Sequence, residues 1–312
     1  MVARYLVTGA NGFIGRVVCA HLQAQGAEVI ALLRRTAVGP WHTAILGDLT
    51  QSLELSAWGQ VDGVVHLAGV AHQQASLAQY QQTNVEATAR LVLACQQAHV
   101  PRLVYISSVK AMGETTPTVG LDETAPCQPT TPYGRSKYAA EQQVRQALPV
   151  ETVILRLPLV YGPQVKGNLA KLLRWTQAGL MPPLPETGNR RSLIHVQDVA
   201  QAIGQALRLP GIAGQVYVLA EPRAYSAGEL GALLRQATGL PPARWHLPRW
   251  VWYLAARTGD GLRAVGLPTP LDHALYQRLF DSACYRSDKA LRELQFQPRY
   301  NLAAGLHAMV RP

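Results

Sequence analysis

The sequence predicts an α/β protein with a doubly wound parallel sheet and a smaller C-terminal α/β domain. Short apolar runs of strand length alternate with stretches typical of helices along most of the chain, and this alternation is typical of parallel sheets covered by helices. The first apolar run leads into a glycine-rich turn and then into a helical stretch. A length of 312 residues, of which 48% are hydrophobic, is sufficient for a large buried core.

The composition argues against several classes of protein. The net charge of +10 is spread over scattered arginines, and the pairs Arg34-Arg35 and Arg190-Arg191 fit a phosphate-bearing small ligand better than nucleic acid. The chain opens on a strand, and the apolar stretch 251–256 is far shorter than the ~20 residues that span a bilayer, so no membrane segment is expected. Four widely spaced cysteines predict neither disulfides nor a metal site and fit a reducing, cytoplasmic setting. They are Cys19, Cys95, Cys127 and Cys284.

The N-terminal strand, 4–8, is followed by a turn with Gly9, Gly12 and Gly15 and by the helical stretch 16–25. In such a turn the first glycine permits a tight bend, the second lets a pyrophosphate approach the backbone, and the third lets helix and strand pack closely. Phosphates then lie at the helix N-terminus, where free N–H groups favour anions. We therefore predict a dinucleotide site. Its loop contacts are Gly9, Asn11, Gly12, Phe13, Ile14 and Gly15.

The second strand, 28–33, ends where an NAD-binding protein carries an acidic residue that holds the ribose 2′-hydroxyl. Here Leu33 occupies that position, and Arg34 and Arg35 follow it. An arginine suits a 2′-phosphate, so Arg34 favours NADP, with NAD as the alternative. The simpler interpretation is that both arginines are solvated charges closing the strand.

Five further strands are predicted, at 44–46, 62–67, 103–108, 151–156 and 215–219. The carboxyl ends of parallel strands face the crevice where open α/β sheets bind ligands. We expect two of these ends to contact the cofactor through side-chain-poor segments. The expected contacts are Asp48 and Leu49 at the adenine, with Leu67, Ala68 and Gly69 along the cofactor.

The stretch from Tyr133 to Lys137 begins a helix, with Thr131 as N-cap and Pro132 as the first helical residue. Tyr133 and Lys137 are four residues apart and share one face. A phenol has a pKa near 10, roughly three units too high for proton transfer at neutral pH, and a nearby cation lowers such a pKa by about 1 to 3 units. We therefore expect Lys137 to lower the pKa of Tyr133, and Tyr133 to serve as a proton donor and acceptor.

The same Tyr-x-x-x-Lys spacing occurs again at Tyr285 and Lys289, so the spacing alone is weak evidence. We interpret that second stretch as an ordinary helix start. Tyr133 is the stronger candidate because a predicted strand upstream of it ends at Ser108, whose hydroxyl faces the crevice.

Together these stretches resemble the extended short-chain dehydrogenase/reductase family, which contains NAD(P)-dependent epimerases, dehydratases and reductases of sugar nucleotides. The resemblance runs from Tyr5 to Leu306. It implies a Rossmann fold, a UDP-sugar substrate and a homodimer. Its carriers are Thr8 to Gly15, His66 to Gly69, Asn84, Ser107-Ser108, Tyr133 with Lys137, Arg156, Val160 to Pro163, Arg191 to Asp198, and Ser287 to Ala290 with Leu294 and Pro298.

By this resemblance Tyr133 is the catalytic acid/base, Lys137 orients the nicotinamide ribose, and Ser108 bonds the reacting sugar oxygen. Pro158 and Asn84 join the cofactor contacts, although Asn84 is equally well interpreted as a satisfied amide of the core.

The chain is expected to divide into a cofactor domain, 1–163 plus 193–221, and a nucleotide-sugar domain, 164–192 plus 222–312. Arg278 is a weaker substrate candidate because the usual Arg-x-Gly-Asp pattern is missing. The substrate contacts implied by the resemblance are Ser108, Val109, Lys110, Tyr133, Asn168, Leu169, Arg191 and Arg278. Four aromatic residues at helical spacing are expected in the core rather than in a stacking platform: Trp245, Trp250, Trp252 and Tyr253.

Two departures from the family pattern are Leu159 in place of an asparagine and Ser192 in place of an aspartate. Dehydratases need an Asp-Glu pair where this chain has Val109 and Lys110, which argues against a 4,6-dehydratase. A 4-ketoreductase and a 4-epimerase remain, together with a non-catalytic NADP-binding module, which commonly lacks the tyrosine or lysine.

Three stretches most resemble bacterial 4-reductases that act on UDP-4-keto-6-deoxy-N-acetylhexosamines, form UDP-N-acetylquinovosamine-type sugars for surface polysaccharide such as O-antigen, and are often labelled UDP-glucose 4-epimerases. They are the stretches 107–114, 158–168 and 189–193. The expected reaction is therefore NADPH-dependent reduction at C4 of such a sugar.

Overall fold

The computed structural model describes residues 2–51, 53–71, 75–267, 269 and 271–310. Its centre is a seven-stranded parallel sheet with the strand order β3-β2-β1-β4-β5-β6-β9. This is the doubly wound Rossmann order with one added strand, so the predicted fold class is confirmed. The strands are β1 (Arg4–Thr8), β2 (Glu28–Leu33), β3 (Thr43–Leu46), β4 (Gly63–His66), β5 (Arg102–Ser108), β6 (Glu151–Leu157) and β9 (Gln215–Val218).

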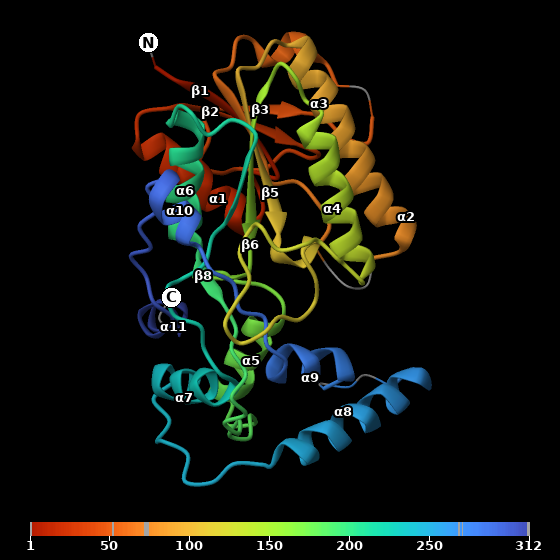
Figure 1. Ribbon diagram of the computed structural model, residues 1–312, viewed down its shortest axis with the longest axis vertical. Coiled ribbons are helices and arrows are strands. Elements are labelled where there is room, and N and C mark those ends of the chain that lie inside the picture. The colour runs from red at the N-terminus through yellow and green to blue at the C-terminus, as the bar shows by residue number, and fades with distance from the viewer. Residues whose placement is uncertain (1, 52, 72–74, 268, 270, 311–312) are drawn as a thin grey trace.

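Helices cover both faces of the sheet, which explains why its inner strands β5 and β6 are almost continuously buried (Figure 1). One face packs against α1 (Phe13–Ala24), α6 (Val196–Arg208) and α10 (Asp288–Glu293), and the other against α3 (Ala87–Gln97) and α4 (Pro132–Arg145). Three short elements connect strands and helices near the carboxyl edge. They are α2 (Leu77–Tyr80), the π-helix η2 (Gln81–Glu86) and the 3-10 turn η3 (Val109–Ala111); a further 3-10 turn, η1 (Leu55–Trp58), precedes β4.

The later chain builds a second region with its own hydrophobic cluster, which Figure 1 shows beyond the carboxyl ends of the central strands. It contains a two-stranded parallel ribbon, β7 (Leu159–Tyr161) with β8 (Leu193–His195). Its helices are α5 (Asn168–Gln177), α7 (Ala227–Ala237), α8 (Arg249–Ala264), α9 (His273–Phe280) and α11 (Leu302–Val310).

One expectation needs correction. Only Trp252 of the four aromatic residues is in the core; Trp245, Trp250 and Tyr253 are 60%, 64% and 42% exposed. Trp245 precedes α8, and Tyr253 contacts His273 and Tyr276 of α9 at the edge of its ring while remaining partly open to solvent. The second Tyr-x-x-x-Lys stretch lies at a helix start, since α10 begins at Asp288 and Tyr285 lies in the segment before it.

Within residues 2–51, 53–71, 75–267, 269 and 271–310, none of the helices is long and apolar enough to cross a bilayer. The same ranges contain no group of three or more histidine, cysteine, aspartate or glutamate side chains arranged to hold a metal ion.

Candidate active site

The glycine turn between β1 and α1 has no room for a side chain at Gly9 or Gly15. Gly9 has a φ of +67°, and a Cβ there would lie 2.7 Å from the backbone nitrogen of Ala68. A Cβ on Gly15 would lie 2.2 Å from the carbonyl oxygen of Gly9. Gly12 caps α1 with its backbone alone, so the first N–H groups of the helix have no side-chain partner at the cap. This backbone cradle fits the pyrophosphate of a dinucleotide.

The segment after β4 is held by Asn84. Its amide donates to the carbonyl oxygen of Val70 (3.0 Å) and to Ser136 Oγ (2.9 Å), and its oxygen accepts from the N–H of Val70 (2.8 Å). Asn84 is 1% exposed, so its hydrogen-bonding capacity is used within the protein. Of the two interpretations left open by the sequence, the geometry favours the core amide. Asn84 ties the 68–70 segment to α4.

The exit of β2 is positively charged. Leu33 is buried, whereas Arg34 and Arg35 are exposed, and neither guanidinium forms a hydrogen bond or ion pair with another of the residues that the structure describes. Asp48 accepts from the N–H and hydroxyl of Thr50, both at 2.8 Å; these bonds lower its pKa, and the charge of Arg34 makes a smaller contribution in the same direction. Asp48 therefore serves the turn after β3, and the next residue, Leu49, is buried in the core.

Tyr133 and Lys137 lie on the first turns of α4, as the sequence predicts. Thr131 caps this helix by accepting from the N–H of Gly134 (3.1 Å), and Pro132 is its first residue. Lys137 is 6% exposed; its Nζ donates to the carbonyl oxygen of Ile106 (2.7 Å) and lies 4.3 Å from the ring centre of Tyr105. Both of these partners belong to β5. Contacts with this strand therefore fix the ammonium group of Lys137, which lies on the same helix as Tyr133.

The ionisation of Tyr133 differs from the expectation. Burial raises its pKa to about 12, although a hydrogen bond with Ser108 acts in the opposite direction. Burial also lowers the pKa of Lys137 to about 7. The Lys137 ammonium donates to a backbone carbonyl oxygen rather than to the Tyr133 phenol. Desolvation therefore outweighs the lowering of the Tyr133 pKa that the sequence led us to expect. A phenol with this pKa is protonated at neutral pH and is able to donate a proton.

A buried ion pair lies directly beneath these residues. Arg156 on β6 donates to both oxygens of Glu141 on α4 (3.0 and 2.7 Å), and Ser107 on β5 donates to the same carboxylate (2.6 Å). Arg156 and Glu141 are 2% and 0% exposed. Burial alone would lower the pKa of Arg156, and its bonds to Glu141 and the charge of that carboxylate raise it overall. The pair fixes α4 to two strands, one turn after Lys137.

The charges of Lys110, Arg191 and Arg278, which form a cationic cluster, influence one another. Arg191 and Arg278 both lower the pKa of Lys110, although burial contributes more. Burial also lowers the pKa of Arg191 to about 10, and Arg278 adds to this effect. Glu114 is the nearest carboxylate, at 2.8 Å from Lys110 Nζ. The charges of Asp281 and Asp272 act on Arg191 and Arg278, respectively. The structure thus brings Arg278 close to Lys110 and Arg191 despite the missing sequence pattern.

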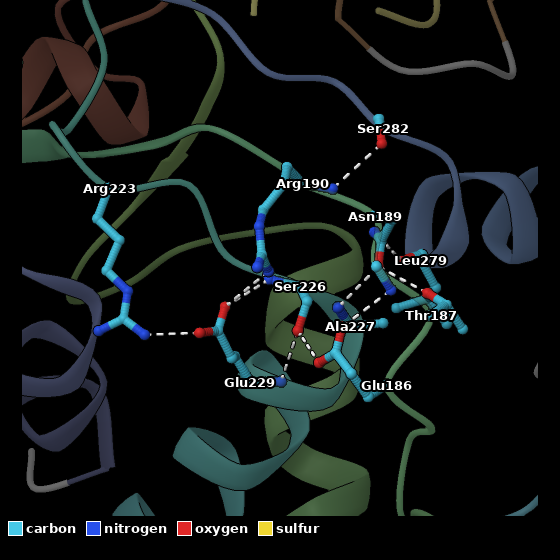
Figure 2. Close-up of polar contacts among 11 residues, drawn as sticks. Glu186, Thr187, Asn189, Arg190, Arg223, Ser226, Ala227, Glu229, Leu279 and Ser282 are labelled. Atoms are coloured by element: carbon cyan, nitrogen blue, oxygen red, sulfur yellow. Dashed lines mark hydrogen bonds and ion pairs between the residues drawn. The ribbon is translucent and has the colours of Figure 1, made fainter. Parts of the chain in front are cut away.

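The loop before Arg191 is tied to α7 and α9 (Figure 2). Asn189 donates to the carbonyl oxygen of Leu279 (3.0 Å) and accepts from the N–H of Ala227 (3.0 Å). Arg190 turns away to pair with Glu229 on α7 at 3.4 Å. Of the two adjacent arginines, therefore, only Arg191 belongs to the cationic cluster.

Several remaining candidates occupy less informative positions. Asn168 begins α5 and is partly exposed, but the Leu169 side chain is 1% exposed and belongs to the second region's core. Val109 is also buried, and it belongs to a small hydrophobic cluster. Pro158 is partly exposed and Leu159 is 44% exposed, beyond the end of β6.

A family model described as the NAD dependent epimerase/dehydratase family matches residues 5–220. The chain belongs to this family. It is accordingly an enzyme of the NAD-dependent epimerase/dehydratase group, and the matched range contains both the glycine cradle and the Tyr133 helix.

Relatives within this family carry out different reactions. The chain is 30% identical over 263 residues to the UDP-glucose 4-epimerase of Vibrio cholerae, covering 79% of each protein. It is 28% identical over 328 residues to the 2-alkyl-3-oxoalkanoate reductase of Stenotrophomonas maltophilia, covering 98% of each. The solved structure of MoeE5 in complex with UDP-glucuronic acid and NAD has a TM-score of 0.79 at 26% identity, covering 99% of this chain and 98% of that one.

Sequence reasoning missed two parts of this family member's site. The Glu141–Arg156 pair joins residues 15 apart on different elements, and Glu114 bonds Thr131 across 17 residues. For the Glu141–Arg156 pair, the only available sign in the sequence was a polar residue on the inward face of a predicted helix or strand. The bond between Glu114 and Thr131 had no sign in the local sequence.

Proposed function

We propose that the protein is an NADPH-dependent 4-ketoreductase that acts on a UDP-4-keto-6-deoxy-N-acetylhexosamine. The observation that carries this proposal is the exit of β2, where the buried Leu33 occupies the position of the acidic residue and the exposed Arg34 follows it. An enzyme that recycles one hydride internally gains nothing from reading a 2′-phosphate. One that consumes hydride draws on the NADPH pool.

The residues present fit a nicotinamide dinucleotide, because the glycine cradle leaves space and free N–H groups for its pyrophosphate. When bound, the cofactor supplies the hydride that reduces the ketone carbon. In the proposed mechanism Ser108 hydrogen-bonds the ketone oxygen, and Tyr133, protonated at neutral pH, donates its proton to that oxygen as negative charge develops there. Lys137 orients the nicotinamide ribose from the adjacent turn of α4.

The proposed substrate carries a diphosphate, and the cationic cluster supports this choice. Arg191 and Arg278 provide planar guanidinium groups suited to phosphate oxygens, and Lys110 adds a third positive charge. We propose that residues 164–192 and 222–312 form the nucleotide-sugar domain, with Asn168 as a further contact. The partly exposed Leu159 would then offer an apolar surface to the sugar.

Elimination of water is not part of this proposal. A dehydratase needs carboxylates after the catalytic hydroxyl, and here Val109 is buried and Lys110 is paired with Glu114. We further propose that the enzyme is a cytoplasmic homodimer supplying sugars for surface polysaccharide. Light scattering on the purified protein tests the dimer.

The second candidate is a UDP-hexose 4-epimerase, favoured by the similarity to the Vibrio cholerae protein of that name. The two reactions are separated by incubating the protein with the 4-keto sugar nucleotide and NADPH, and in parallel with UDP-galactose and UDP-N-acetylglucosamine without added cofactor. We expect NADPH oxidation in the first set and no interconversion in the second. Interconversion without NADPH oxidation would leave the epimerase standing.

A further inference from the structure

Glu114 connects the segment that follows Ser108 to the start of α4. Its Oε1 accepts from Thr131 Oγ1 at 2.6 Å, and its Oε2 lies 2.8 Å from Lys110 Nζ. Lys110 Nζ also donates to the carbonyl oxygen of Glu114 at 2.9 Å, and its backbone N–H donates to Ser108 Oγ at 3.2 Å. One carboxylate therefore bonds both the residue that caps Tyr133's helix and the lysine two residues after Ser108.

The two segments joined by Glu114, which are the start of α4 and the segment after Ser108, pack closely against each other. A Cβ on Gly134 would lie 2.4 Å from the carbonyl oxygen of Lys110. Thr131 uses its oxygen to cap α4 and its hydrogen to bond Glu114. Any shift of the carboxylate is therefore passed to the first turn of α4, where Tyr133 lies.

The carboxylate also acts on Tyr133 through its charge. The charged and titratable groups around the phenol come from α2 (Tyr80), from β5 (Ser108 and Tyr105) and from the loop after η3 (Glu114), with Lys137 on α4 itself. Burial has the largest effect on the pKa of Tyr133; Tyr80 and Glu114 raise it, and the bond with Ser108 lowers it.

We propose that Glu114 is a positioning residue for the reaction: it holds the first turn of α4 against the Ser108 segment and places a negative charge beside the Tyr133 hydroxyl. Lys110 is the counter-charge that keeps this carboxylate in place. The inference rests on the proposed role of Tyr133 as acid/base. It explains why the chain has a lysine and a glutamate four residues apart next to the catalytic serine.

Glu114→Gln keeps the size of the side chain and removes its charge. The readout is the pH dependence of kcat for oxidation of UDP-N-acetylquinovosamine with NADP⁺, which rises as Tyr133 loses its proton. We expect the rise to move to lower pH by about 0.5 unit or more, because an anion near the phenol has been removed. Lys110→Met leaves Glu114 without its counter-charge and moves the rise to higher pH. The control is Glu28→Gln at the amino end of β2, where Glu28 pairs with Arg4; this variant leaves the pH dependence of kcat unchanged.

The positional part is tested at Thr131. Thr131→Ala loses both the bond to Glu114 and the cap of α4, and it lowers kcat without moving the pH profile. Thr131→Ser keeps both bonds and restores kcat. An unchanged or upward-shifted profile in Glu114→Gln, with the fold verified by circular dichroism, overturns the inference. Full activity in Tyr133→Phe would instead overturn the proposed acid/base, and this inference with it.

Discussion

Removal of the buried carboxylate of Glu141 should destabilise the protein strongly. In Glu141→Ala the guanidinium of Arg156 stays buried and loses both of its bonds to Glu141, and the Ser107 hydroxyl loses its acceptor. Breaking a buried ion pair from one side costs about 3–5 kcal/mol. With an unfolding entropy of roughly 2.1 cal/mol/K per residue, this lowers Tm by about 5–8 °C in a chain of this length.

The control is an exposed ion pair of the same residue types. Glu86 and Arg90 lie 3.8 Å apart with side chains 46% and 42% exposed, so Glu86→Ala should change the free energy of unfolding by less than about 1 kcal/mol. Urea unfolding followed by circular dichroism measures both variants. If Glu141→Ala unfolded at the same urea concentration as Glu86→Ala, the argument that this pair anchors α4 would be refuted.

Three further predictions concern single side chains. Tyr133→Phe should lower kcat at least about a hundredfold while cofactor binding, measured by fluorescence titration, is kept, whereas Tyr285→Phe should change kcat little; equal losses would show that the wrong tyrosine was chosen. Arg34→Ala should weaken NADPH binding about tenfold or more relative to NADH, because one charge-assisted contact is worth roughly 1.5–3 kcal/mol, and equal losses for both cofactors would exclude a role at the 2′ position. Burial raises the pKa of Glu221 to about 7 from 4.5, so the folded state holds this proton more tightly than the unfolded chain and stability falls as the pH rises from about 4.5 to 7. Glu221→Gln should remove this loss, so Tm measured at pH 5 and pH 8 should fall less in the variant than in the wild type; a parallel fall would contradict the assignment.

Much of the structure around the glycine turn and the Tyr133 helix can be predicted from local sequence. The glycine turn at Gly9 to Gly15 and the Tyr133 helix are set by neighbouring residues, namely glycines that alone fit the turn and a Thr-Pro start that alone defines the helix. These features were predicted because short-range sequence specifies short-range structure.

The features that were not predicted depend on tertiary packing. The pKa of Lys137 falls because β5 and α4 exclude water from it, and no local pattern encodes that exclusion. Trp250 lies at helical spacing, but periodicity does not say which side of α8 is covered. Likewise, Glu114 finds Thr131 only after the chain has folded back between them.

In the proposed reaction, hydride from NADPH ends on C4 of the sugar while Tyr133 supplies the proton. It is tested most directly with NADPH deuterated at the transferred position, the UDP-4-keto-6-deoxy-N-acetylhexosamine and the purified protein, with the product examined by NMR and mass spectrometry. We expect one deuterium per product molecule, located at C4, and almost no product with Tyr133→Phe in the same time. A product without deuterium, or interconversion of UDP-sugars with the added NADPH left unchanged, would contradict it.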